Sequence, residues 1–291
     1  MVKKKEFSVN DLPKYSPWPA RLMGLENWEP RLKTPKEVAR EFESEKWGQL
    51  LQRAENTNAP LSVEDVDEWI FHDNPDQLCS IKKRLVLLNY RESHKKYLDL
   101  LEKIIKKYLP ASALIELGAG YGSVIIPLAR KKCFQNIPIY AGEYTRSGTK
   151  LLRILSRDEK KQIHYGRCDF NLPDFLDFGI PQEGIIFTSF STCYLTNMTN
   201  KFIESFLSLN PKVIINIEPC YDHFTHNTLM DLMRKRYIEV NGYNKNLVAL
   251  LKKFENDKKV EILEELPAVF GANPILPASI IVWKGLRNED Y

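Results

Sequence analysis

Short apolar runs alternate with helical patterns in the sequence after Pro110. The runs are ALIELG, IPIYAGE, QIHYGRCD, GIIFTSF and KVIINIE. Near-continuous apolar strands separated by helices are typical of a parallel sheet that is covered on both faces. The last two runs, KVEILEELPAVF and PASIIVWKG, have only a loop between them. They predict a terminal antiparallel pair, so the fold class is α/β with a mostly parallel sheet.

The first third of the chain has a different, mainly helical pattern. Thr34 stands where a helix N-cap is expected, directly before Pro35, and Ser62 precedes a second helical pattern. The segment from Ile81 to Leu109 predicts one long helix, which ends at Pro110.

These patterns divide the chain into two parts. We predict a helical N-terminal cap at residues 1–109, which covers the substrate, and an α/β core at residues 110–291.

Composition and charge exclude several functional classes. Hydrophobic residues make up 43% of the chain and charged residues 27%, as in globular proteins. The net charge of +4 is spread evenly along the chain, so no cationic patch predicts binding to nucleic acid. No apolar run is long enough to span a membrane, and no apolar segment follows the basic N-terminus.

The cysteines predict a reducing environment. There are five of them, widely spaced and without a CxxC pair, so neither a disulfide framework nor a zinc site is indicated. We therefore expect a cytoplasmic protein with no bound metal. The sequence does not indicate an oligomeric state.

Three glycines follow the first strand of the predicted sheet. They stand at alternate positions in IELGAGYGSVIIPLAR, residues 115–130, which then continues as a helical pattern. Glycine is used where another group must approach the backbone closely, and the turn after the first strand of such a sheet is where nucleotide-like cofactors bind. The dinucleotide fingerprint GxGxxG requires a third glycine at position 123, which is Ser123.

The segment from Glu116 to Gly122, ELGAGYG, has the form ExGxGxG. In this segment and in its order of strands the chain resembles the class I (Rossmann-like) S-adenosylmethionine-dependent methyltransferases, over residues 110–285. The resemblance implies a seven-stranded, mostly parallel sheet with a terminal antiparallel hairpin. It also implies S-adenosylmethionine as the cofactor.

The same resemblance implies which residues bind the cofactor. The glycines let the methionine and ribose moieties lie against the main chain, and Glu116 faces the cationic end. Glu143 accepts hydrogen bonds from the ribose hydroxyls, and Asp169 accepts one from the adenine amino group. The predicted cofactor-binding residues are Glu116, Gly118, Gly120, Tyr121, Gly122, Glu143, Tyr144, Asp169, Phe170 and Ser191.

The loop after the fourth strand, STCYLTN, carries the first catalytic candidate. It lacks the [DNS]PP[YF] motif of amino-N methyltransferases that act on nucleic acids, which counts against that activity. Tyr194 in this loop is expected to pack near the sulfonium.

The segment after the fifth strand, NIEPCYDHFTHNT, carries the other catalytic candidates. His223 is a candidate general base, with Glu218 or Asp222 orienting it, because histidine accepts a proton near neutral pH. Two alternatives stay open: Asp222 or Thr225 caps the next helix, or four side chains form a zinc site. These four are Cys193, Cys220, His223 and His226.

We therefore predict an S-adenosylmethionine-dependent methyltransferase. The expected acceptor is an oxygen or nitrogen of a small molecule, a sugar or a peptide side chain. One alternative is methylation of a protein or peptide residue, with the cap as docking surface. A second is a non-catalytic cofactor-binding module of the same fold, and a third is an RNA methyltransferase.

Overall fold

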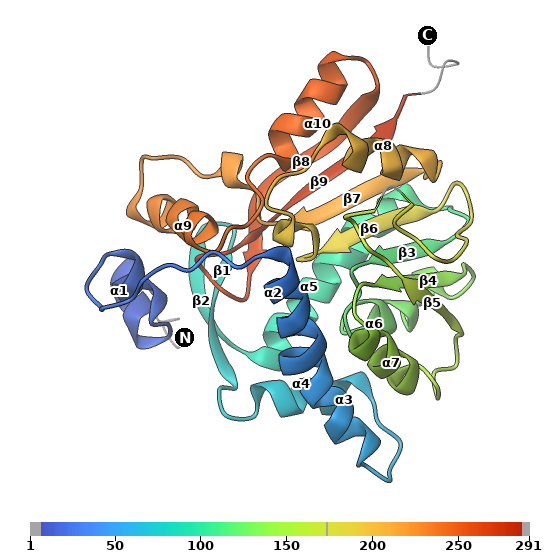
Figure 1. Ribbon diagram of the computed structural model, residues 1–291, viewed down its shortest axis with the longest axis horizontal. Coiled ribbons are helices and arrows are strands. Elements are labelled where there is room, and N and C mark those ends of the chain that lie inside the picture. Colours follow the sequence, from blue (N-terminus) through green and yellow to red (C-terminus); the bar gives the residue numbers. More distant parts are fainter. Residues whose placement is uncertain (1–6, 173, 287–291) are drawn as a thin grey trace, which may run out of the picture.

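The computed structural model describes residues 7–172 and 174–286, which form a single sheet of nine strands (Figure 1). The strand order is β2-β1-β8-β9-β7-β6-β3-β4-β5. The strands are β1 (Asp76–Ile81), β2 (Arg84–Asn89), β3 (Leu114–Leu117), β4 (Ile139–Glu143), β5 (Ile163–Arg167), β6 (Ile185–Ser189), β7 (Val213–Glu218), β8 (Val260–Gly271) and β9 (Ala278–Gly285).

The strands after Pro110 follow the predicted α/β pattern. The pairs β4–β5, β3–β4, β3–β6 and β6–β7 are parallel. Strand β9 lies antiparallel between β7 and β8, which confirms the terminal antiparallel pair. The chain runs from β3 outward to β5 and then returns to β6 on the other side of β3. This reversal creates a topological switch point between β3 and β6, where ligands bind in open α/β sheets.

The predicted count of seven strands is wrong, because β1 and β2 extend the sheet beyond β8. The helix expected over residues 81–109 is also wrong in its first part. Residues 84–89 form β2, and helix α5 begins only at Tyr90, where the Asn89 side chain accepts a hydrogen bond from the Arg91 N–H at 3.1 Å. The short apolar run LVLL fits both the helical period of 3.6 residues and the strand period of two. Pairing with β1 decides in favour of a strand.

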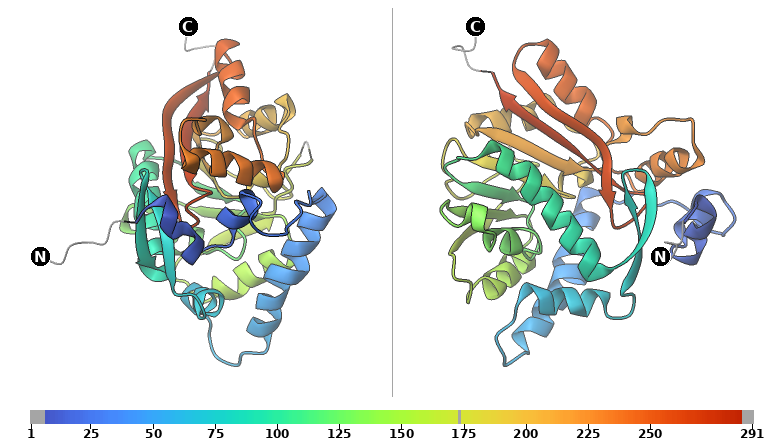
Figure 2. Two further views of the ribbon diagram at one scale, coloured as in Figure 1. Left: turned by 90° about the vertical axis from the view of Figure 1, so that its left-hand side faces the viewer. Right: turned by 180° about the vertical axis from the view of Figure 1, so that it is seen from behind.

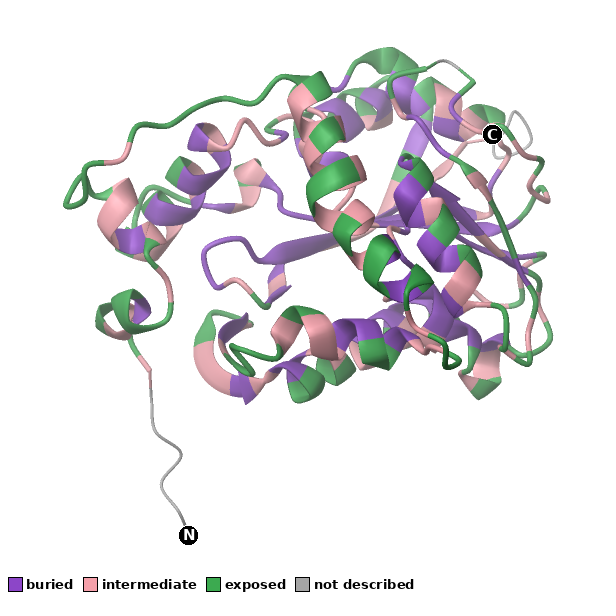
Figure 3. Cartoon of the chain, turned by 60° about the horizontal axis from the view of Figure 1, so that its bottom comes forward, coloured by how far each residue is buried: buried purple, intermediate pink, exposed green. Residues whose placement is uncertain are grey.

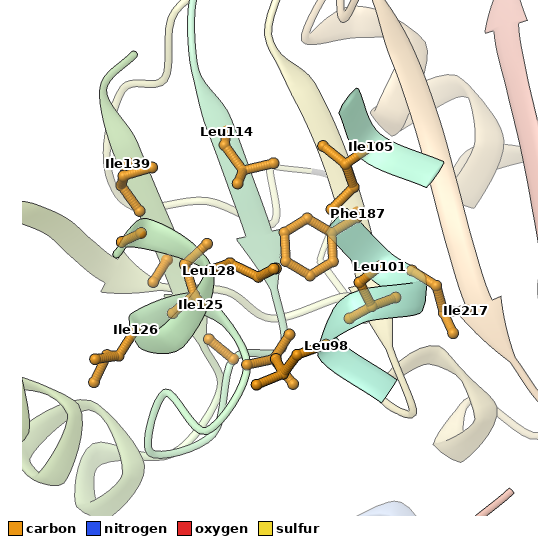
Figure 4. Packing of buried hydrophobic residues seen from close by; sticks show 14 of the residues in the cluster. Leu98, Leu101, Ile105, Leu114, Ile125, Ile126, Leu128, Ile139, Phe187 and Ile217 are labelled. Atoms are coloured by element: carbon orange, nitrogen blue, oxygen red, sulfur yellow. The ribbon is translucent and has the colours of Figure 1, made fainter. Parts of the chain in front are cut away.

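Helices cover both faces of the sheet. On one face lie α5 (Tyr90–Ile105), α6 (Ile125–Ala129) and α7 (Arg146–Leu155); α5 crosses the sheet in the right-hand view of Figure 2. Figure 4 shows apolar side chains of α5 and α6 packed against β3, β4, β6 and β7, with Leu101 of α5 close to Phe187 of β6. On the opposite face, α8 (Asn200–Ser208) and α10 (Leu247–Asn256) pack through a second cluster that includes Phe206 and Trp283.

The N-terminal residues pack in two places. Helix α1 (Trp18–Leu22) lies against α9 (Leu229–Val240) in a third cluster that includes Leu12 and Tyr237. Helices α2 (Pro35–Arg40) and α3 (Trp47–Glu55) are joined by one π-helical segment, 41–46, and α4 (Val63–Phe71) follows. Figure 3 shows that these helices expose one side, whereas the strands are mostly buried.

The N-caps predicted at Thr34 and Ser62 are confirmed, each with a capping box. The division into a cap at residues 1–109 and a core at residues 110–291 stays a prediction. The hairpin β1–β2 lies in the first of these parts but belongs to the same sheet as the second.

Candidate functional site

A cavity of about 710 Å³ opens where β3, β4, β5 and β6 end. Its position is the switch point of the sheet, and its volume lies in the upper part of the usual range for ligand sites, roughly 300–1,000 Å³. Tyr194 lines the cavity, and so do most of the predicted cofactor-binding residues. The cofactor-binding residues in the lining are Glu116, Gly118, Gly120, Tyr121, Glu143, Tyr144, Phe170 and Ser191.

The glycine turn after β3 brings bare main chain to the cavity. Gly118 has a φ of 83° and Gly120 a φ of 56°, both in the left-handed region that favours glycine. A Cβ atom on Gly118 would lie 2.2 Å from the Cβ of Ser191, so no other residue fits there without movement. Gly122 does not line the cavity; a Cβ there would meet Leu152 of α7 at 2.5 Å, so this glycine allows helix packing.

Glu143, the last residue of β4, closes the turn from the neighbouring strand. Its Oε2 accepts a hydrogen bond from the Gly120 N–H at 2.8 Å. Its Oε1 accepts from the N–H and the hydroxyl of Thr145 at 2.9 and 2.6 Å. Burial raises the pKa of Glu143, while these donors oppose the shift. The carboxylate is thus held at the cavity wall.

Glu116 is buried beside the cavity with one oxygen unsatisfied. Its side chain is only 2% exposed, and Oε2 has no hydrogen-bond partner among the described residues. Burial raises the pKa of Glu116 well above its usual range, the charge of Glu143 adds to this, and the Ile125 N–H opposes it. Buried polar atoms without a partner are rare in proteins. A donor group or a cation of a ligand can satisfy this oxygen.

The segment after β5 supplies Phe170 and Asn171 to the cavity. Asp169 itself is not among the lining residues. Its Oδ1 accepts hydrogen bonds at 3.1 Å from both the backbone N–H and the side-chain amide of Asn171. Asp169 therefore fixes the neighbouring residue that reaches the cavity, and its contact with adenine stays a prediction.

Glu218 holds the loop that follows β6. Its carboxylate is 1% exposed and accepts three backbone hydrogen bonds, from Ser191 and Thr192 at 3.1 Å and from Cys193 at 3.2 Å. Burial raises the pKa of Glu218, and these N–H donors lower it. Glu218 does not line the cavity, so its observed contacts position Ser191 and the following Tyr194.

The structure does not bring His223 or Asp222 to the cavity. His223 contacts both β8 and β9, with Nδ1 2.7 Å from the Ser279 hydroxyl and Nε2 2.7 Å from a Glu265 oxygen. Asp222 is exposed, and the next helix is capped by Thr228 instead of Asp222 or Thr225. The described residues contain no group of three or more side chains suited to hold a metal, which gives no support to the zinc alternative.

The segment from α2 to α3, which lies within the predicted cap, forms one wall of the cavity, although the sequence did not predict which of its residues line it. Trp47 packs edge-on against Tyr121 of the glycine turn at 5.2 Å, and Phe42 packs against Tyr194 at 5.0 Å. Glu43 accepts hydrogen bonds from the backbone N–H groups of residues 146 and 147 at 2.7 and 3.2 Å. It therefore caps the N-terminus of α7, where a negative charge is favoured.

One face of α5 forms a further wall that sequence reasoning missed. Tyr90, Ser93, His94 and Tyr97 recur at helical spacing and all line the cavity. The spacing was visible in the sequence, but nothing local distinguishes this face from an ordinary core face. Only the β1–β2 hairpin and the crossing of α5 over the sheet turn it toward the cavity.

The strand order, the glycine turn and the acid at the end of the second parallel strand are features of one fold. The chain has the Rossmann-like fold of the class I S-adenosylmethionine-dependent methyltransferases. Its sequence matches no protein-family model and no curated protein.

Solved structures are similar to this fold at low sequence identity. The magnesium protoporphyrin IX methyltransferase of Synechocystis PCC 6803 with bound S-adenosylhomocysteine is 14% identical, with a TM-score of 0.51 over 86% of this chain and 99% of that chain. The same enzyme with bound S-adenosylmethionine is 12% identical, with a TM-score of 0.49 over 88% and 100%. A methyltransferase from Clostridium acetobutylicum ATCC 824 is 12% identical, with a TM-score of 0.45 over 66% and 91%.

None of the helices in residues 7–172 and 174–286 is both long and apolar enough to cross a membrane. The cytoplasmic location expected from the cysteines stays a prediction.

Proposed function

We propose that this protein is an S-adenosylmethionine-dependent methyltransferase that acts on an oxygen or nitrogen nucleophile. The observation that carries the proposal is one cavity wall, made by the bare turn at Gly118 and Gly120, the carboxylate of Glu143 and the unsatisfied Oε2 of Glu116. The Synechocystis structure with the same fold contains bound S-adenosylhomocysteine, which supports this donor.

The residues present fit that donor. Glu143 is placed to accept hydrogen bonds from ribose hydroxyls, and the turn at Gly118 and Gly120 admits a ligand close to the main chain. Tyr144 and Phe170 line the same region and offer aromatic faces to adenine. The unsatisfied Oε2 of Glu116 suits an ammonium or other cationic group. When bound, S-adenosylmethionine supplies an electrophilic methyl group on a positively charged sulfur.

The surrounding chain controls access to that methyl group. The wall from α2 to α3 packs Trp47 and Phe42 against the turn and against Tyr194, and so limits water at the donor site. Methyl transfer depends mainly on alignment of the acceptor, and on a base if the nucleophile arrives protonated. The related fold by itself does not set the acceptor. We propose a small molecule, a sugar or a peptide side chain.

The cofactor assignment is tested by calorimetric titration with S-adenosylhomocysteine. Hydrogen bonds to a charged group are worth about 1.5–3 kcal/mol, so Glu143→Ala should weaken binding about tenfold or more. Glu204→Ala, on the exposed side of α8, is the matched control and should bind like the wild type. Equal affinity of Glu143→Ala and the wild type, or tight binding of NAD in place of S-adenosylhomocysteine, would contradict the assignment.

An assay of S-adenosylhomocysteine formation with different acceptors distinguishes the alternative functions. Formation of S-adenosylhomocysteine from S-adenosylmethionine with any acceptor excludes the non-catalytic alternative. Saturation by peptides instead of metabolites would favour a peptide or protein residue as acceptor. Binding to RNA that falls steeply with salt would favour the RNA alternative.

A further inference from the structure

The cavity has a second end, built from aromatic side chains. Phe71 stacks on Tyr90 with ring centroids 5.0 Å apart and an interplanar angle of 20°. Tyr97 stacks on Phe270 at 5.3 Å and 30°. All four line the cavity together with Phe190, and we call this set the aromatic end. None of the five belongs to the glycine turn; Phe190, which directly follows β6 beside Ser191, lies nearest to the proposed cofactor residues.

Aromatic walls favour a planar ligand. Ring faces pack best against other flat groups in offset or edge-on arrangements, which contribute about 0.5–1.5 kcal/mol beyond the area that they bury. Cavities of this kind take their affinity from apolar surface and their specificity from a few polar groups. Here the polar groups near the rings are Gln77, Ser93, His94 and Ser189, and the last of these bonds to the Tyr97 hydroxyl at 2.6 Å.

The charges around the cavity disfavour an anionic acceptor. Lys46 is the only lysine or arginine among the described residues that line it. Its Nζ lies 3.1 Å from a Glu41 oxygen and 4.0 Å from the Phe42 ring centroid, so this cation already has partners. A phosphate or carboxylate in the aromatic end would be buried without a counter-charge, which costs several kcal/mol.

Among the four polar groups named above, His94 is the one suited to take a proton. Its Nε2 lies 3.0 Å from the carbonyl oxygen of Ser123. A carbonyl oxygen only accepts hydrogen bonds, so Nε2 must carry the proton. In the neutral ring, Nδ1 is then the nitrogen with the lone pair, because the hydrogen bond of one nitrogen fixes the state of the other. The backbone of the loop after the glycine turn thus sets the tautomer that a base requires.

We propose that the acceptor is a planar, uncharged hydroxy-aromatic molecule that binds in the aromatic end, with His94 as the catalytic base. The inference rests on the proposed function and names its substrate class. The acceptor oxygen gains the methyl carbon as the carbon–sulfur bond of the donor breaks, and the hydroxyl proton passes to Nδ1 of His94. The products are the methyl ether, neutral S-adenosylhomocysteine and a protonated imidazole, which returns its proton to solvent.

A binding experiment with 2-naphthol tests the aromatic end without turnover. The protein is first saturated with S-adenosylhomocysteine, and 2-naphthol is then titrated by calorimetry. Ala272 is exposed and lines the cavity, so Ala272→Trp should abolish saturable 2-naphthol binding and leave the affinity for S-adenosylhomocysteine intact. Ala59→Trp, at an exposed position away from the cavity, is the matched control and should bind both ligands.

The outcomes separate this inference from the proposed function. Failure of S-adenosylhomocysteine to bind overturns the proposed function itself. Binding of S-adenosylhomocysteine without saturable binding of 2-naphthol overturns only the assignment of the aromatic end. Unchanged 2-naphthol affinity in Ala272→Trp does the same, because the ligand would then lie elsewhere.

Turnover tests the role of His94. The wild type should convert 2-naphthol to its methyl ether, and His94→Ala should lose about 10²-fold or more of this rate, with partial recovery on addition of imidazole. His72→Ala removes an exposed histidine that does not line the cavity and should turn over normally. Binding of S-adenosylhomocysteine by His94→Ala shows that the variant is folded. No ether from the wild type, or wild-type turnover by His94→Ala, overturns the proposal.

Discussion

Replacing Glu218 by glutamine should loosen the loop that carries Ser191 and Tyr194. In the structure both carboxylate oxygens of Glu218 accept backbone hydrogen bonds, two through Oε1 and one through Oε2. An amide has only one acceptor oxygen, and its NH₂ group would face an N–H donor in the other position. Whichever way the amide is oriented, at least one buried N–H loses its partner.

The number of N–H groups that lose their partner sets the size of the expected destabilisation. A buried donor left without a partner costs about 1–3 kcal/mol, and the loss of the charge weakens the hydrogen bonds that remain. We therefore expect Glu218→Gln to lower the free energy of unfolding by about 1–3 kcal/mol in urea titrations followed by far-ultraviolet circular dichroism. The same variant should bind S-adenosylhomocysteine more weakly, because Ser191 touches the glycine turn through a 3.0 Å hydrogen bond to the Leu117 carbonyl.

The matched control is Glu261→Gln on strand β8 of the same sheet. Its carboxylate forms an exposed ion pair with Lys284 at 3.2 Å, which should contribute less than about 1 kcal/mol. If Glu218→Gln unfolds at the same urea concentration as Glu261→Gln and binds S-adenosylhomocysteine like the wild type, then Glu218 does not hold the loop.

Two further substitutions test the cavity wall. Gly118→Ala should lower the free energy of unfolding by about 2–5 kcal/mol, because a left-handed alanine costs about 1–2 kcal/mol and its Cβ would clash with Ser191; Gly179→Ala, with open space around it, should be neutral in the same urea assay. Glu116→Gln should change the pH dependence of stability. Burial raises the folded-state pKa of Glu116 above its usual value of about 4.5, so the folded state keeps a proton that the unfolded state has lost. The contribution of Glu116 to the free energy of unfolding is fully present below the unfolded-state pKa. It falls by about 1.4 kcal/mol per pH unit as the pH rises toward the folded-state pKa. Urea midpoints measured at pH 5, 6 and 7 should fall less steeply for Glu116→Gln; identical slopes would contradict a protonated Glu116.

Local features of the sequence were enough to predict the part of the site built by single strand–turn–helix units. The alternation of apolar runs predicts parallel strands, and the ends of these strands must meet at one edge of the sheet. The order of the strands was therefore sufficient to place the glycine turn and Glu143 side by side. The capping boxes at Thr34 and Ser62 were equally readable, because a cap depends on residues three positions apart.

The predictions failed for residues whose structure or hydrogen-bond partners are decided by segments distant in the sequence. Residues 84–89 became a strand because β1, which itself pairs with the edge of β8, offered pairing along all six residues. Glu218 ends β7 and His223 follows it, yet the hydrogen bonds of Glu218 go to a loop and those of His223 go to β8 and β9. The spacing of residues along the chain carries no information about such partners.

The chain's own periodicity and its glycines thus specify a sheet with a ligand-binding turn, since these features act over a few residues. Which side chains complete the cavity depends on contacts between segments that are far apart in the sequence, such as Glu43 with the N-terminus of α7 and Tyr97 with Phe270. Those contacts form only when the packing of helices on the sheet brings the segments together. The acceptor end of the site is therefore a property of the packed molecule.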